Sequence, residues 1–276
     1  MEVAKKIVLK DCGTTCIYHR GCIDGFGAAY SVWKALGGGV NYVGAAYGQL
    51  PPPIKDRRVI IVDFSYPRDV LLGIAKQANE LILLDHHQTA EEELRNFPIG
   101  HIEIDQTKSG TRLAWEHFCK GQIPELLEYI EDYDLDRHAF VDTQRVILGL
   151  QCHPLDFEIW DALDLTTLRT DGAVIEKYYS RKVTEIVSRS FREIIGGYSV
   201  PVCNAPIFMA NDVAKALAAN EKFAASVWHT DEGTVYSLRS NKSGINVAKI
   251  ALAYGGGGHK HCAGFWLPRH EALEGS

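Results

Sequence analysis

Several aspartate and histidine residues in this sequence come directly after short apolar segments. Asp85, His86 and His87 follow residues 81–84, and Asp63 ends a β-branched run of the same kind. Carboxylates and neutral imidazoles suit manganese, iron, cobalt or zinc better than calcium. For one such stretch taken alone, an aspartate that caps a turn beside two surface histidines is the competing interpretation.

A third apolar segment, residues 15–18, ends in the same way at His19, and Asp24 opens the helix that follows. In an open parallel sheet, ligands bind outside the carboxyl ends of the strands, so three such ends predict one polar rim. The expected members of this rim are His19, Asp24, Asp63, Asp85, His86, His87 and one aspartate of residues 132–136.

This supply of donors exceeds what one ion needs and suits two cations that share a carboxylate. Cations roughly 3.5–4 Å apart can clamp the attacking and leaving oxygens of a phosphoryl centre. Asp63 is the candidate bridge, because its strand is predicted to lie between the other two. One imidazole of the His86–His87 pair is expected to bind metal and the other to face the substrate. Asp85 is either a ligand or a residue that orients an imidazole.

A glycine run near the C-terminus is the second candidate site. Residues 255–258 are all glycine, His259 follows, and residues 263–265 read Ala-Gly-Phe. Glycine lets backbone amides approach an anion, although such runs also form flexible turns. The run lacks the lysine and the Ser/Thr of a P-loop. Arg239, at the end of a predicted strand, is either a phosphate-binding fork or part of a surface ion pair.

The Asp85-His86-His87 motif, followed by the glycine run with His259, resembles the DHH phosphoesterase superfamily with a C-terminal DHHA1 domain. The resemblance extends from His19 to Phe265. It implies a two-domain, usually manganese-dependent phosphoesterase of the RecJ-like or oligoribonuclease-like kind, with its active site in the cleft between the domains. The residues to which it gives roles are His19, Asp24, Asp63, His86 and Asp132 as metal ligands, His87 with Asp85 in catalysis, and Arg239, Gly256, Gly257, Gly258 and His259 in substrate binding.

One position departs from the family pattern. The first motif of the family usually has two aspartates separated by one residue, whereas Cys22 stands here in the first place, two residues before Asp24. A thiolate favours zinc or iron over manganese. Cys22 is therefore either a further ligand or a residue that only packs nearby. We expect two Mn²⁺ ions, with Mg²⁺, Co²⁺ and Zn²⁺ as alternatives.

Alternating strand and helix patterns from residue 15 to about 104 predict an α/β fold with a parallel sheet. We expect a DHH domain at 1–170, a connecting helix at 171–196 that ends at a Gly-Gly pair, and a smaller mixed α/β DHHA1 domain at 197–276. His101 and His117 show no ligand-like spacing and are expected to be surface or hydrogen-bonded residues.

Composition limits the classes of function. The 276 residues have a net charge of −6, which disfavours a protein that wraps long duplex nucleic acid. There is no run of roughly 18 apolar residues and no signal-peptide core, so no membrane partner is expected. Seven scattered cysteines favour a reducing, cytoplasmic location.

The sequence thus predicts a metal-dependent phosphodiesterase that uses activated water on a short oligonucleotide or on a linear or cyclic dinucleotide. A RecJ-like single-strand DNA exonuclease and a non-catalytic nucleotide sensor are the alternatives. A homodimer is left open.

Overall fold

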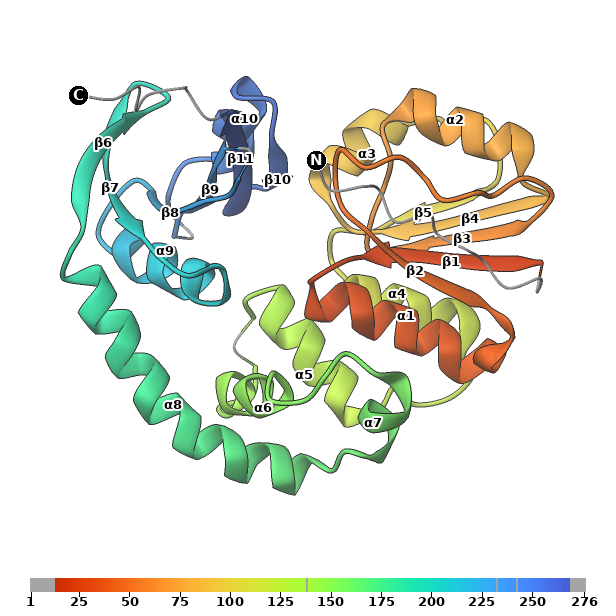
Figure 1. Ribbon diagram of the computed structural model, residues 1–276, viewed down its shortest axis with the longest axis horizontal. Helices are drawn as coiled ribbons and strands as arrows, with labels where there is room; N and C mark the ends of the chain where they lie inside the picture. The colour runs from red at the N-terminus through yellow and green to blue at the C-terminus, as the bar shows by residue number, and fades with distance from the viewer. Residues whose placement is uncertain (1–12, 138, 232, 242, 269–276) are drawn as a thin grey trace. The chain divides into compact units, whose positions relative to one another are not determined.

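The computed structural model describes residues 13–268 except positions 138, 232 and 242. The chain divides into two compact units, Met1–Glu176 and Lys177–Ser276 (Figure 1). Each unit has its own sheet and its own apolar core.

The N-terminal unit is built on a five-stranded parallel sheet with the order β2-β1-β3-β4-β5. Its strands are β1 (Thr14–His19), β2 (Asn41–Ala45), β3 (Arg58–Val62), β4 (Glu80–Asp85) and β5 (His101–Ile104). The interiors of β3 and β4, residues 59–62 and 81–84, are apolar because helices cover both faces of the sheet. The predicted parallel α/β architecture is therefore confirmed.

Successive residues of each strand point to opposite faces of this sheet, and each face has its own helices (Figure 1). Ile61 and Leu83 belong to the cluster that includes residues of α2 and α3. Ile60 and Leu84 pack in the other cluster, with residues of α1 and α4. The helices are α1 (Ile23–Leu36), α2 (Arg68–Gln77), α3 (Gln88–Leu94) and α4 (Gly110–Phe118), and a short 3₁₀ turn, Gly37–Gly39, follows α1. Fully burying a leucine-sized side chain contributes about 1.5–3 kcal/mol, so these faces fix the register of the strands.

A second helical layer covers the outer side of α1. It consists of α5 (Glu125–Asp134), α6 (Thr143–Leu150) and α7 (Phe157–Ala162). Phe26 and Tyr30 of α1 pack with Leu127, Ile147 and Trp160 of these helices. This layer determines where the acidic end of α5 lies.

The predicted long helix is present, but its bounds differ from the prediction. Helix α8 spans Leu165–Val187, and the boundary between the two units falls inside it. The expectation of a helix that continues to residue 196 is wrong, since β6 (Phe191–Ile195) and β7 (Tyr198–Asn204) form an antiparallel hairpin there. Gly196 and Gly197 have φ values of 59° and 83°. Two successive residues with positive φ are the requirement of a tight hairpin turn, so the glycine pair ends a strand rather than a helix.

The C-terminal unit has a six-stranded mixed sheet with the order β10-β11-β9-β8-β7-β6, in which β7 and β8 are parallel. The remaining strands are β8 (Ala224–His229), β9 (Gly233–Arg239), β10 (Gly257–His259) and β11 (Cys262–Pro268). Helix α10 (Val247–Ala253) packs on the face that includes Ala225 and Val227. Ser226 faces the other way and donates to Ala210 O in α9 (Ala210–Ala218), which follows the 3₁₀ turn Ile207–Met209. This is the smaller mixed α/β domain that the sequence predicts.

Within the described residues, no helix combines the length and the apolar character needed to cross a bilayer.

Candidate metal centre

The register of the N-terminal sheet brings the predicted rim residues into one row. Tyr18, Val62 and Leu84 are aligned across β1, β3 and β4. The next residue along β1 is His19, and the next residue along β4 is Asp85. Asp63 directly follows β3, which lies between these two strands. Three segments far apart in sequence therefore deliver their polar side chains to the same edge, as their apolar-then-polar pattern predicts.

Asp63 occupies the centre of this row. Its carboxylate is 1 % exposed, with Oδ1 at 3.0 Å from His86 Nε2 and Oδ2 at 3.6 Å from His19 Nδ1. Its φ is 53°, which turns the chain sharply after β3 while its amide still donates to Leu84 O at 2.9 Å. A non-glycine residue in this region costs on the order of 1–3 kcal/mol, and such strain concentrates at functional sites.

The donors form two groups of three, and within each group the ligand atoms lie within 4.8 Å of one another. We call them triad A and triad B. Triad A contains His19, Asp63 and His87. Triad B contains Asp24, His86 and Asp134. Since the two oxygens of Asp63 are directed at different imidazoles, Asp63 joins triad A to triad B and has the placement that a bridging ligand needs.

The spacing inside triad B fits a bound cation. His86 Nε2 lies 3.6 Å from Asp24 Oδ2 and 3.6 Å from Asp134 Oδ2. Ligand atoms that surround one ion at bonds of about 2.0–2.2 Å are separated by distances of this size. In addition, Asp63 Oδ2 and Asp85 Oδ2 are buried without a hydrogen-bond partner in the described part of the chain. An orphaned carboxylate oxygen beside imidazoles is a donor that a cation would satisfy.

The start of helix α4 positions Asp24. The amide of Gly110 donates to Asp24 Oδ2 at 2.7 Å, and the amide of Thr111 donates to Asp24 Oδ1 at 3.0 Å. A helix N-terminus favours a carboxylate, so α4 holds Asp24 in one orientation. A Cβ at Gly110 would overlap the Asp63 side chain, and a Cβ at Gly25 would overlap the His19 carbonyl. Both glycines are therefore needed for close packing around the ligands.

Asp85 orients the double histidine. Its Oδ1 accepts from the His86 amide at 2.7 Å and lies 2.7 Å from His87 Nδ1. The carboxylate is fully buried. Of the two roles that the sequence left open, the geometry favours orientation, because a carboxylate bonded to one ring nitrogen fixes the tautomer and directs the other.

The acidic end of α5 supplies a different aspartate from the one expected. Asp132 accepts hydrogen bonds from the amide of Ala139 at 2.7 Å and from the hydroxyl of Thr143, which ties down the loop after the helix. Asp134 is the member of this run that lies beside His86. Residues two apart on a helix point in different directions, so only one of the pair can reach the site. The structure thus replaces Asp132 with Asp134 in the candidate ligand set.

The charges of the site explain its pKa shifts. Burial raises the pKa of Asp24 and of Asp134, and the charge of Asp63 raises both further. Burial also opposes ionisation of Asp63, but the neighbouring His19 and His86 outweigh it and hold the pKa of Asp63 well below its usual range. Burial lowers the pKa of His86, yet Asp63, Asp134 and Asp24 raise it to about 11. A proton on His86 therefore balances negative charge that a metal ion could balance instead.

Two further residues border the site. Burial raises the pKa of the Cys22 thiol well above its usual value, and the carboxylates of Asp63 and Asp134 add to the shift. Cys22 is therefore close to both triads. The ring centroid of Tyr47 lies 5.5 Å from that of His19 and 6.3 Å from that of His87, and the residue is 54 % exposed, so it stands at the solvent side of the site. The sequence analysis missed Tyr47, because no aspartate or histidine follows β2 to mark the end of that strand as part of the site.

The candidate substrate-binding residues of the C-terminal unit also come together. Cys262 pairs with His259 on one side and with Arg239 on the other, so the three residues form a row across β10, β11 and β9. Directly paired residues present their side chains on the same face of a sheet. Arg239 donates to Asn211 Oδ1 in the same unit.

The glycines of the run have a structural role in this hairpin. Gly257 and Gly258 belong to β10, and Gly258 has a φ of 136°. A Cβ at Gly256 would overlap the Gly264 carbonyl on β11. Close packing of the two strands accounts for these positions, whereas their role as an anion cradle stays a prediction.

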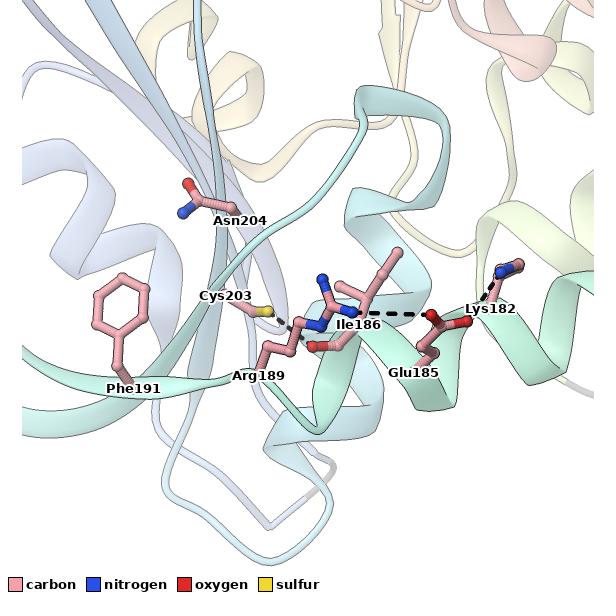
Figure 2. A pocket seen from close by; sticks show the side chains of 7 residues that line it. All are labelled: Lys182, Glu185, Ile186, Arg189, Phe191, Cys203 and Asn204. Carbon is pink, nitrogen blue, oxygen red and sulfur yellow. Dashed lines mark hydrogen bonds and ion pairs between the residues drawn. The ribbon is translucent and has the colours of Figure 1, made fainter.

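A separate pocket of about 400 Å³ lies in the C-terminal unit beside the end of α8 and strands β6 and β7 (Figure 2). Its cationic side chains, Lys182 and Arg189, both lie near Glu185, at 2.8 and 3.8 Å. Cys203 Sγ donates to Ile186 O at 3.0 Å. These groups already have partners, so we assign no site to this pocket.

No protein-family model matches the chain. Uncharacterized protein R106 of Acanthamoeba polyphaga mimivirus is 28 % identical over 287 residues, which cover 92 % of this chain and 68 % of that protein.

Three solved structures are similar in fold. A pGpG-specific phosphodiesterase from Vibrio cholerae has a TM-score of 0.51 at 15 % identity and covers 92 % of this chain and 93 % of its own. The DHH domain of a protein described as a member of a family of ribosomal proteins has a TM-score of 0.56 at 10 % identity, with 93 % and 83 % covered. An exopolyphosphatase-related protein from Bacteroides fragilis has a TM-score of 0.53 at 14 % identity, with 96 % and 88 % covered.

Proposed function

Because the chain has the fold of the DHH phosphoesterases, we propose that it is a metal-dependent hydrolase of phosphate esters. The observation that carries the proposal is the pair of ligand triads joined by Asp63, whose two oxygens are directed at His86 and His19. Two cations held by ligands that share a carboxylate are the arrangement that stabilises both the attacking and the leaving oxygen of a phosphoryl transfer.

The ligand set is proposed to hold two Mn²⁺ ions, in triad A and triad B, with Asp63 between them. Bound cations supply Lewis acidity and lower the pKa of water. Asp24 is held by the amides of Gly110 and Thr111, so it can bind an ion without rotating. Asp85 holds His87 at Nδ1, which leaves Nε2 as the atom that can bind an ion or give a proton to the leaving oxygen.

The proposed substrate is a short oligonucleotide or a dinucleotide. One protein of similar fold is named as a pGpG-specific phosphodiesterase, which is a precedent for a two-nucleotide substrate on this scaffold. The net charge of −6 opposes extended binding of a long polyanion, but it permits a few local cationic contacts. Arg239 and His259 are the proposed contacts to substrate phosphate, because they share one row of the C-terminal sheet.

The test is release of mononucleotide from pGpG by the purified full chain with added Mn²⁺. Asp63→Asn keeps the shape of the side chain but removes the charge of the proposed bridge, so turnover is expected to fall at least ~10²-fold. Asp171→Asn, on the exposed side of α8, is the matched control and is expected to retain full activity.

Excess chelator should abolish release by the unaltered chain. If the unaltered chain releases no more product than Asp63→Asn, the hydrolase proposal is wrong. Retained binding of pGpG in that case would favour the nucleotide-sensor alternative.

A further inference from the structure

Three side chains with metal-binding atoms meet on the N-terminal unit outside triads A and B. They are His101 and Glu103 of β5 and His117 of α4, and their ligand atoms lie within 4.8 Å of one another. His101 Nε2 is 3.5 Å from Glu103 Oε2, and the ring centroids of His101 and His117 are 4.9 Å apart.

The fold explains why these residues converge. His101 and Glu103 are two apart on a strand, so both point to the same face of the sheet. Strand β5 is an edge strand, and His117 reaches this face from the last turn of α4. Since all three belong to regular elements, their backbones are held without a bound ion.

This cluster is distinct from the candidate metal centre. Gly110, at the start of α4, binds Asp24, whereas His117 is seven residues further along the same helix. A rise of 1.5 Å per residue places the two ends about 10 Å apart. His101 is aligned with Ile82, near the beginning of β4, whereas the sheet residues of triads A and B lie at the ends of their strands or directly after them.

Two imidazoles and one carboxylate form a donor set suited to zinc and to other late divalent transition metals. The side chains of His101 and Glu103 are 52 % and 40 % exposed, so an ion can reach them from solvent and they can rotate to close the distances. Zinc accepts three protein ligands with water as the fourth, and therefore no further side chain is needed.

We propose that His101, Glu103 and His117 form a second metal site, of the zinc class, that fastens the edge strand β5 to helix α4. Triad B has two carboxylates and one imidazole and suits manganese better than this set of one carboxylate and two imidazoles, so the proposed site differs from triad B in the metal it prefers. Bridging β5 to α4 would also restrain an edge strand, which is the part of a sheet most prone to pair with other chains.

The test is zinc titration of the full chain in the Asp63→Asn background, which weakens the first centre. We expect one equivalent of zinc to bind, and His101→Asn and His117→Gln each to weaken it at least tenfold. His229→Asn changes a histidine of the C-terminal unit that contacts Thr234 and is expected to leave this equivalent unchanged. Circular dichroism would confirm that each variant is folded.

A second measurement tests the fastening itself. Zinc should slow amide hydrogen exchange in β5 of the Asp63→Asn parent, but it should not slow exchange in β5 when His117→Gln is added to that parent. Equal zinc binding by the parent and both histidine variants would overturn the site. An equal loss of zinc affinity in the His229→Asn control would also overturn it, because zinc would then be bound by scattered surface histidines.

Discussion

Replacing Gly110 with alanine tests whether the helix start, and not only the ligands, builds the metal centre. An added Cβ would overlap the Cβ of Asp63 and come within 2.9 Å of both Asp24 Oδ2 and Asp63 Oδ1. Carbon atoms pack at about 3.5–4.0 Å, so Asp63 must move by roughly 1 Å. A displacement of this size in a catalytic group can cost ~10² in rate. We therefore expect a ~10²-fold loss of Mn²⁺-dependent turnover, although no ligand has been removed.

The change in stability should be modest by comparison. Overpacking costs about 1–3 kcal/mol, offset in part by the better helix propensity of alanine. Gly73→Ala in α2 is the matched control, because its Cβ would meet nothing within 4 Å. That variant should gain about 0.4–1 kcal/mol and keep full activity.

The assays are mononucleotide release from pGpG, Mn²⁺ titration and urea unfolding for the parent and both variants. Normal turnover and normal Mn²⁺ affinity in Gly110→Ala would refute the placement of Asp24 and Asp63 against α4. If Gly110→Ala lost activity only because it unfolds, its urea midpoint would fall. Gly73→Ala shows what replacing a helix glycine does to activity and stability when the added Cβ meets no neighbour.

Two other predictions concern the chemistry of the site. Cys22→Asp should fold normally and shift metal preference from zinc toward manganese, because a carboxylate is a harder ligand than a thiolate. Competition titrations measure the ratio of zinc affinity to manganese affinity. An unchanged ratio would show that Cys22 does not bind the metal. For the metal-free chain in excess chelator, the free energy of unfolding should fall as pH rises from about 6.5 toward the His86 pKa of about 11. Protonated His86 contributes its full stability below the pKa that histidine has in the unfolded chain, and this stability is lost as His86 deprotonates in the folded chain. Metal affinity should rise over the same interval as the competing proton leaves. Denaturant titrations that show rising stability of the metal-free chain across this range would contradict the assignment of charge in triad B.

The sequence predicts the rim of the N-terminal sheet well because the signal is local. An apolar run that ends in aspartate or histidine marks a buried strand and its exposed end, and parallel pairing then brings His19, Asp63 and Asp85 together. The parallel direction of the strands also follows from this pattern, since each helix must return the chain to the same edge.

The choice between Asp132 and Asp134 could not be made from sequence. It depends on the loop after α5, in which Ala139 and Thr143 bond to Asp132 and turn it away from His86. Gly110 and Thr111 are similar cases, since their contacts to Asp24 span more than 80 residues. Such contacts are properties of the tertiary fold.

In the C-terminal unit, prediction from sequence failed for a different reason. The glycine pair after residue 195 fits a helix end and a hairpin turn equally well by composition. In the sequence, Phe191 and Ile194 continue the spacing of about 3.6 residues that predicts the helix at 171–196. In the structure these residues lie on β6 and are 47 % and 74 % exposed. The preceding helix had already ended at Val187. Periodicity therefore misled because the two residues face solvent, where packing does not impose it.

Three unfavourable features meet at Asp63, and a bound cation would relieve two of them directly and offset the third. Its backbone has a positive φ, one of its buried oxygens has no hydrogen-bond partner in the described residues, and its charge opposes the ionisation of Asp24 and Asp134. Each feature destabilises the chain without a cation, and a selected core would not retain all three in one place without a function. A bound cation would satisfy the oxygen and neutralise the carboxylates together. Ligand binding at 100 times Kd adds about 2.7 kcal/mol to the stability of a folded chain, which is comparable with the strain expected of one residue in this conformation. The cost of building the site is therefore of the size that its proposed occupant can offset.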